Sequence, residues 1–91
     1  MKDALIDLKN IYTKYSELIE VARKEYEKVK GEEAYPLRDI IADLKEVDEG
    51  ISMQTTIYFA TNGKVKKKNL DKLNSMLTDC ENKLKIRLDK N

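Results

Sequence analysis

Few side chains in this sequence are suited to catalysis. Histidine is absent from all 91 residues, which removes the commonest general base and the usual transition-metal ligand. Hydrolases that pair a nucleophile with histidine are therefore excluded. Cys80 is the only cysteine. It lies on a predicted apolar helix face, where burial raises the pKa of a thiol and makes it unreactive. We expect a protein that is not an enzyme.

The pattern of acidic residues and glycines does not indicate a metal or phosphate site. Asp43, Glu46, Asp48 and Glu49 lie close together in the sequence, but the order of residues found in a calcium loop is absent. The three glycines stand apart, so there is no glycine-rich phosphate loop. We interpret these carboxylates as a solvated helix face and expect no metal and no cofactor.

The densest run of charge is the only candidate for contact with nucleic acid. It consists of Lys64, Lys66, Lys67 and Lys68, which together could neutralise several phosphates. The run contains no arginine and no interleaved aromatic residue. We keep the binding of nucleic acid or nucleotide phosphate as the alternative function, beside the interpretation of the run as a solvated turn.

A neutral segment is the first surface that could bind a partner. Residues 51–63 contain no charged side chain, although 38% of the chain is charged. Within it, Tyr58 and Phe59 are of the aromatic type that dominates interface energetics. Residues 51–59 either form the part of the core where the helices meet, which we favour, or receive the apolar face of a partner.

An acidic stripe is the second surface predicted to bind a partner. Its members share one helix face through spacings of four and three, and they are Asp39, Asp43 and Glu46. Residues 1–50 carry 9 basic and 13 acidic side chains, a net charge of −4, whereas residues 51–91 carry 9 and 4, a net charge of +5. This asymmetry more often reflects attraction between helices than a specialised binding face.

Hydrophobic periodicity predicts three long helices that position these side chains. They cover residues 3–30, 36–61 and 65–88. Asp3 is the expected N-cap of the first helix and Gly31 its expected C-cap. Pro36 favours a helix start, and Tyr35 before it is expected to be extended and outside the helix. In the third helix, Asn69 is a possible N-cap, unless that helix begins a turn earlier.

The end of the second helix has two interpretations. Asn62 and Gly63 favour a left-handed helix cap, which we prefer. However, residues 55–59 favour strand and Asn-Gly is a strong hairpin signal, so residues 55–67 could instead form a β-hairpin. Gly50 is a further weak point, because an interior glycine suggests a kink, a close helix crossing or a break.

The expected architecture is all-α, an antiparallel bundle of three long helices that forms one domain over residues 1–91. A hydrophobic content of 41% beside heavy lysine and glutamate usage is typical of amphipathic helices. The first helix has a second apolar row, a width that suits packing against two neighbours; the row is Leu5, Tyr12, Ile19 and Tyr26. Pairing with a second copy, as a homodimer or higher oligomer, stays open.

Location and function follow from what the sequence lacks. A single cysteine suits a reducing compartment, no apolar run approaches the ~20 residues needed to cross a bilayer, and the N-terminus lacks the pattern of a signal peptide. We therefore expect a cytoplasmic protein without a membrane span. With no catalytic side chains and two candidate surfaces, the predicted function is to bind and modulate another protein, as an inhibitor, adaptor, chaperone or immunity-type factor.

The immunity-type expectation also has a resemblance behind it. In length, and in the region from Tyr58-Phe59-Ala60 to Lys64-Val65, the sequence is loosely similar to small helical bacteriocin immunity proteins. The similarity includes no motif that is diagnostic of that family.

Overall fold

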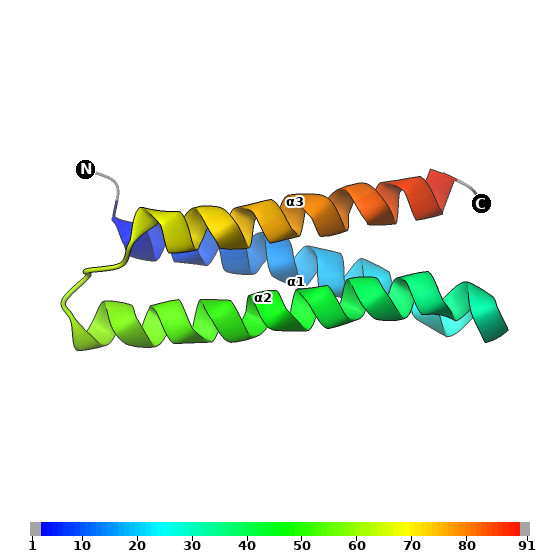
Figure 1. Cartoon of the computed structure of the whole chain (residues 1–91), viewed down its shortest axis with the longest axis horizontal. Helices are drawn as coiled ribbons and strands as arrows, with labels where there is room; N and C mark the ends of the chain where they lie inside the picture. Colours follow the sequence, from blue (N-terminus) through cyan, green and yellow to red (C-terminus); the bar gives the residue numbers. More distant parts are fainter. Residues whose placement is uncertain (1–2, 90–91) are drawn as a thin grey trace.

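Three α-helices form an antiparallel bundle in the computed structural model, which describes residues 3–89 (Figure 1). Helix α1 spans Ala4–Lys28, the short 3-10 helix η1 spans Gly31–Ala34, α2 spans Tyr35–Ala60 and α3 spans Lys67–Asp89. The bundle is a rod of 46 × 19 × 17 Å. The predicted all-α, three-helix architecture is confirmed. Within the described residues, no helix combines the length and the apolar character needed to cross a bilayer.

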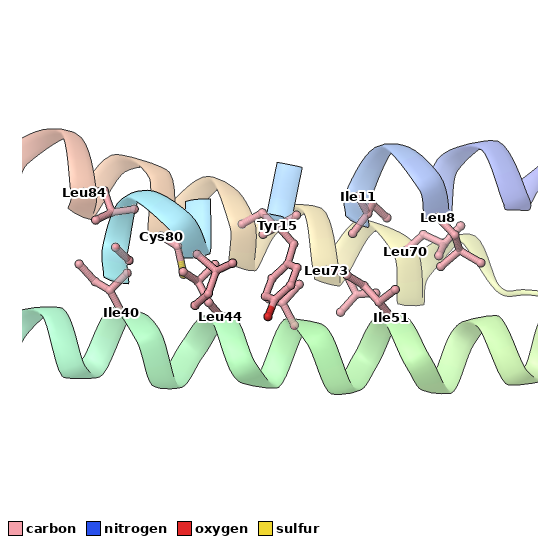
Figure 2. Packing of buried hydrophobic residues seen from close by; sticks show 14 of the residues in the cluster. Leu8, Ile11, Tyr15, Ile40, Leu44, Ile51, Leu70, Leu73, Cys80 and Leu84 are labelled. Atoms are coloured by element: carbon pink, nitrogen blue, oxygen red, sulfur yellow. The ribbon is translucent and has the colours of Figure 1, made fainter. Parts of the chain in front are cut away.

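The core lies along the axis of the rod and receives side chains from all three helices. Because apolar residues recur at spacings of three and four, each helix presents one apolar stripe. The buried core residues are Leu8, Ile11, Tyr15, Ile19 and Ala22 from α1, Leu37, Ile40, Leu44, Val47 and Ile51 from α2, and Leu70, Leu73, Leu77, Cys80 and Leu84 from α3. Figure 2 shows the side chains of α1 and α3 directed toward α2. Burial of one such aliphatic side chain contributes about 1.5–3 kcal/mol.

Gly50 lies where Leu73 of α3 packs against α2. A Cβ atom at this position would lie 2.5 Å from Cδ2 of Leu73, whose side chain is buried. The missing side chain therefore lets Leu73 pack directly over the α2 backbone. The sequence allowed a kink, a close helix crossing or a break at Gly50. The structure shows a close crossing of α2 and α3, and α2 continues through Gly50 without a break.

The end of α2 is a left-handed cap, as predicted. Asn62 and Gly63 have φ angles of 54° and 94°, and the Gly63 N–H donates to the carbonyl of Tyr58 at 2.7 Å, the pattern of a Schellman motif. The alternative hairpin over residues 55–67 is wrong, because the described residues contain no strand. This segment is helical because Ile51 and Tyr58 continue the apolar stripe that α2 presents to the core. These tertiary contacts outweigh the strand propensity of its residues.

Two predicted boundaries between α1 and α2 are wrong. Helix α1 ends at Lys28 with Val29 as its C-cap, so Gly31 is not the cap; with a φ of 69° it instead begins η1. Tyr35 is helical, with φ −58° and ψ −46°, and its N–H donates to the carbonyl of Glu32. Because η1 leads directly into α2, this hydrogen bond outweighs the preference of a residue before proline for extended geometry.

The third helix also begins later than predicted. Its first residue is Lys67, so Val65 lies in the preceding connection, and Asn69 lies inside the helix instead of capping it. Val65 is partly buried against the core. Leu88 continues the apolar spacing of Leu70, Leu73, Leu77, Cys80 and Leu84 but is 39% exposed in the final turn of the helix.

The variant Gly50→Ala tests the close crossing of α2 and α3. Helix propensity alone would stabilise it by about 1 kcal/mol, whereas overpacking against a buried leucine costs about 1–3 kcal/mol. We therefore expect the free energy of unfolding, measured in urea, to fall by about 1 kcal/mol.

A second background provides the control. In a Leu73→Ala protein the obstructing side chain is absent, so there the same Gly50→Ala change should stabilise the bundle. If the change had the same effect in both backgrounds, Leu73 would not be what requires glycine at this position.

Candidate interaction surfaces

The five residues predicted to bind a partner lie in two separate regions of α2. Asp39, Asp43 and Glu46 follow the side of α2 that borders α3, whereas Tyr58 and Phe59 lie in its last turn. At about 1.5 Å per residue, Phe59 is about 30 Å from Asp39 along the helix axis. The structure therefore does not bring these residues together into one site.

The acidic stripe is partly used inside the bundle. The Asp43 carboxylate lies 3.7 Å from the Lys83 ammonium on α3, and Asp39 shares a shallow pocket of about 310 Å³ with Lys83 and Arg87. An exposed ion pair of this kind contributes about 0–1 kcal/mol. The cations of α3 therefore balance part of the stripe, which leaves less acidic surface for a partner than the sequence suggests.

Segment 51–59 contributes both to the core and to the surface. Ile51 and Gln54 are buried, whereas Met53 is 63% and Phe59 66% exposed. The core interpretation is confirmed for the side of the helix with Ile51 and Gln54, and the side with Met53 and Phe59 is exposed. A helix that packs on one face keeps its opposite face in solvent.

Tyr58 ties the end of α2 to the start of α1. Its hydroxyl donates to Oδ1 of Asp3 at 2.9 Å. The same carboxylate oxygen accepts the N–H of Leu5 at 3.0 Å, which makes Asp3 the N-cap of α1, as predicted. The Tyr58 and Phe59 rings meet edge to face, with centroids 5.2 Å apart. Tyr58 is thus a structural contact, and Phe59 is the exposed member of the pair.

A pKa measurement tests the contact between Asp3 and Tyr58. The pKa of Asp3 lies below its ordinary value, chiefly because of the hydrogen bond from the Leu5 N–H and secondly because of the bond from the Tyr58 hydroxyl. Tyr58→Phe removes the second bond, so we expect the Asp3 pKa to rise toward its ordinary value in an NMR titration. Tyr12→Phe, at an exposed tyrosine, is the matched control and should leave it unchanged.

Stability should change with pH in a matching way. Because the folded-state pKa of Asp3 is depressed, its hydrogen bonds stabilise the fold above the unfolded-state pKa, and this contribution is lost as the pH falls through the folded-state value. The wild-type protein and Tyr58→Phe should therefore differ most near neutral pH and converge in acid. A difference that stays constant across the acid range would mean that the Tyr58 hydroxyl does not act through Asp3.

Cys80 is a core residue, as predicted. It is 1% exposed, and Figure 2 shows it above Leu44 of α2. Burial raises the pKa of its thiol, and the carboxylate of Asp43 adds to the effect. A shielded, neutral thiol is a poor nucleophile. Among the described residues, no three histidine, cysteine, aspartate or glutamate side chains are grouped as a metal site requires.

Alkylation measures how well Cys80 is protected. We expect iodoacetamide to modify Cys80 at least about a hundredfold more slowly than a cysteine placed at the exposed position Ser75 of the same helix, because Cys80 reacts only when the bundle opens. Mass spectrometry of a Ser75→Cys protein compares both thiols in one molecule. In denaturant the two rates should converge, whereas equal rates in the native protein would mean that Cys80 is accessible.

A groove between α1 and α2 is a surface that the sequence did not predict. It has a volume of about 670 Å³, and the core residues Leu8 and Ile51 lie in its lining. Its walls are formed by Leu5, Lys9, Tyr12 and Thr13 from α1 and by Asp48, Ser52, Thr55 and Thr56 from α2. Because these helices are antiparallel (Figure 1), the first half of α1 borders the uncharged second half of α2. We call this surface the α1–α2 groove.

The threonine hydroxyls of the α1–α2 groove already donate within their own helices. They belong to Thr13, Thr55 and Thr56, which bond the carbonyls four residues earlier at 2.9, 2.7 and 3.0 Å. An apolar side chain that covers them leaves no hydroxyl donor unpaired, a loss that would otherwise cost about 1–3 kcal/mol. Tyr12 supplies an exposed aromatic wall, 52% exposed, with its ring 6.0 Å from that of buried Tyr15.

The sequence held two signals of this groove. One is the second apolar row of the first helix, with Leu5 and Tyr12, and the other is the absence of charge from residue 51 to residue 63. Neither pattern says which helices are neighbours or at what level they meet. The groove could therefore be recognised only once α1 and α2 were placed side by side.

The predicted basic run lies at the end of the rod where α2 ends and α3 begins (Figure 1). Lys64 and Lys66 belong to the connection and Lys67 and Lys68 to the first turn of α3, and all four are exposed. None of them forms an ion pair within residues 3–89. The structure thus brings these lysines together at one end of the rod, where Lys67 also lines a pocket with Asp7 and Asp71.

No protein-family model, curated protein or solved structure matches this chain. Its function is therefore argued from its own surfaces. These are the acidic stripe, the α1–α2 groove and the basic run.

Proposed function

We propose that this chain is a non-catalytic protein that binds an amphipathic helix of another protein in the α1–α2 groove and thereby modulates that protein, as an inhibitor, adaptor, chaperone or immunity-type factor does. The α1–α2 groove carries the proposal, because it combines buried leucine and isoleucine in its floor with an exposed tyrosine and threonines whose donors are satisfied. Recognition of a helix in a groove relies on such a surface.

A fourth helix laid in this groove would extend the packing of the bundle. Its apolar residues, spaced three and four apart, would contact Leu5, Tyr12 and the threonines while its polar face stayed in solvent. Lys9 of α1 and Asp48 of α2 also line the α1–α2 groove. A partner with an acidic residue near Lys9 and a basic residue near Asp48 would be held in one orientation, since charge complementarity contributes more to specificity than to affinity.

The surfaces suggested by the sequence support this function less well. The acidic stripe faces cations of α3, and Asp43 is already paired with Lys83. Tyr58 is engaged with Asp3, which leaves Phe59 as the free aromatic side chain of its pair. The proposed partner site therefore moves from these residues to the α1–α2 groove.

The proposal that the protein is not an enzyme rests on its side chains. The chain contains no histidine, and its one thiol is buried with a raised pKa. A protein of this kind acts through the surface that it presents.

Two matched threonine variants test the site. Thr56 lines the groove and Thr78 lies on α3; both are exposed, and each hydroxyl donates to the carbonyl four residues earlier at 3.0 Å. Thr56→Glu places a charge where the apolar face of a partner would pack, so we expect partner recovery from the native cell to fall at least about tenfold. Thr78→Glu should leave recovery unchanged, and circular dichroism should show both variants folded.

Photo-crosslinking shows where a recovered partner lies. A benzoylphenylalanine in place of Tyr12 should capture the partner, whereas the same residue in place of Val21, which is 41% exposed on the same helix, should not. Capture from both positions, or recovery that is unaffected by Thr56→Glu, would contradict the proposed site. Crosslinks formed only between two copies of this chain would identify the groove as a homodimer interface and overturn the proposal of a different partner.

A further inference from the structure

One end of the rod combines an exposed aromatic side chain with the four unpaired lysines. Phe59 packs against Tyr58, with ring centroids 5.2 Å apart. The other side of Tyr58 borders Gly63, where an added Cβ would lie 3.4 Å from the ring, and the basic run begins at the next residue. Phe59, Lys64, Lys66, Lys67 and Lys68 are all exposed at this end of the rod, and we call the surface that they form the basic tip.

The connection that carries the first lysines is held by hydrogen bonds. The Thr61 hydroxyl donates to the carbonyl of Ile57 at 2.6 Å and accepts the N–H of Lys64 at 3.1 Å. The cap at Gly63 adds its own bond to the carbonyl of Tyr58. The lysines are thus displayed from an ordered turn, and less conformational freedom is lost when the tip meets a ligand.

Little negative charge accompanies the basic tip. No acidic residue occurs from residue 51 to residue 70, and the first turn of α3 contains none. The acidic residues nearest the tip are Asp3, which accepts hydrogen bonds from Tyr58 and from the Leu5 N–H, and Asp7 and Asp71, which line a pocket together with Lys67. The tip therefore presents a net positive charge to any surface that it approaches.

We propose that the basic tip docks end-on onto an anionic lipid bilayer, with the four lysines at the phosphates and Phe59 inserted among the lipid headgroups. Lysines near an anionic membrane and an aromatic side chain at its interface are a recognised combination for peripheral attachment. The end of a rod that is 19 × 17 Å across is small enough to meet a bilayer through these five side chains.

A nucleic acid fits this end less well. Single strands bind in positively charged grooves with several stacked aromatic residues, and duplex readout favours arginine. The basic tip has one exposed aromatic side chain and no arginine. A bilayer needs neither a groove nor a pattern of donors.

End-on docking leaves the long sides of the rod accessible. The α1–α2 groove extends from Thr56, about 4.5 Å along the helix axis from Phe59, back to Asp48, so a bilayer at the tip would approach only one end of it. The attachment is independent of the proposed helix binding, and either can fail without the other.

Vesicle flotation with the full chain tests the proposal. Vesicles with about one phosphatidylglycerol for every two phosphatidylcholines should bind the protein at about 0.05 M salt, and binding should weaken strongly at about 0.5 M. Neutral phosphatidylcholine vesicles should not bind. Because each lysine near the surface contributes about fivefold, replacing all four by glutamine should lower partitioning at least about a hundredfold.

Matched variants at the other end of the rod control for net charge and for apolar area. Replacing the exposed Lys24, Lys28, Lys30 and Lys85 by glutamine removes the same charge and should have a much smaller effect than replacing the tip lysines. Phe59→Ala should weaken binding about tenfold, whereas Ile86→Ala, at a side chain 59% exposed near the end of α3, should not. The chain has no tryptophan, so emission from Phe59→Trp should shift to the blue when anionic vesicles are added.

Three results would overturn the proposal. One is the absence of binding to anionic vesicles at low salt. Another is equal loss of binding in the two sets of lysine variants. The third is tighter binding to a labelled DNA duplex or single strand than to the vesicles, which would assign the basic tip to nucleic acid.

Discussion

The mutual burial of three apolar helix stripes is the constraint on which the other features of this structure depend. Each stripe contributes five residues to one continuous core. Because most of the stability of a helix in a protein comes from the packing of its apolar face, each helix depends on the other two. The packing is close enough that α3 crosses α2 over a glycine, with Leu73 on its backbone. Side chains that point inward are therefore committed to the core, and those that point outward are available for binding.

This division explains why the thiol of Cys80 is shielded and why the surfaces differ. The only cysteine, Cys80, is buried in the core, and this burial raises the pKa of its thiol. Around the outside, lysines of α1 and α3 reach acidic residues of neighbouring helices, as in the pairs Lys14 with Glu81 and Lys83 with Asp43. These contacts neutralise parts of the border between helices. The α1–α2 groove is instead lined by hydroxyl groups, and the four lysines of the basic tip form no ion pair within residues 3–89.

The end of α2 determines where those two regions lie. Asn62 and Gly63 stop the helix in a left-handed cap, and Tyr58 joins that end to the N-cap of α1. The neutral half of α2 is thereby held against the first turns of α1, which creates the groove. The lysines that follow in the sequence are placed at the end of the rod, beside Phe59. One local cap thus separates a lateral surface from a terminal one.

The type of fold and most residues of the core could be predicted from the sequence. Apolar residues that recur at spacings of three and four indicate an amphipathic α-helix and show which of its faces is buried. The N-cap Asp3, the left-handed cap at Asn62 and Gly63, and the burial of Cys80 are likewise local consequences of residue type and spacing. The helix boundaries near Gly31 and Tyr35 could not be predicted from the sequence. The turn of η1 outweighs the preference of Gly31 for a helix C-cap and that of Tyr35 for extended geometry. The acidic stripe was read correctly as a helix face, but its pairing with Lys83 depends on the neighbouring helix. The α1–α2 groove and the position of Phe59 relative to the lysines were decided by the tertiary structure alone. The packing of side chains between two antiparallel helices sets which residues of one lie opposite which residues of the other, and the residue spacing within either helix does not contain that information.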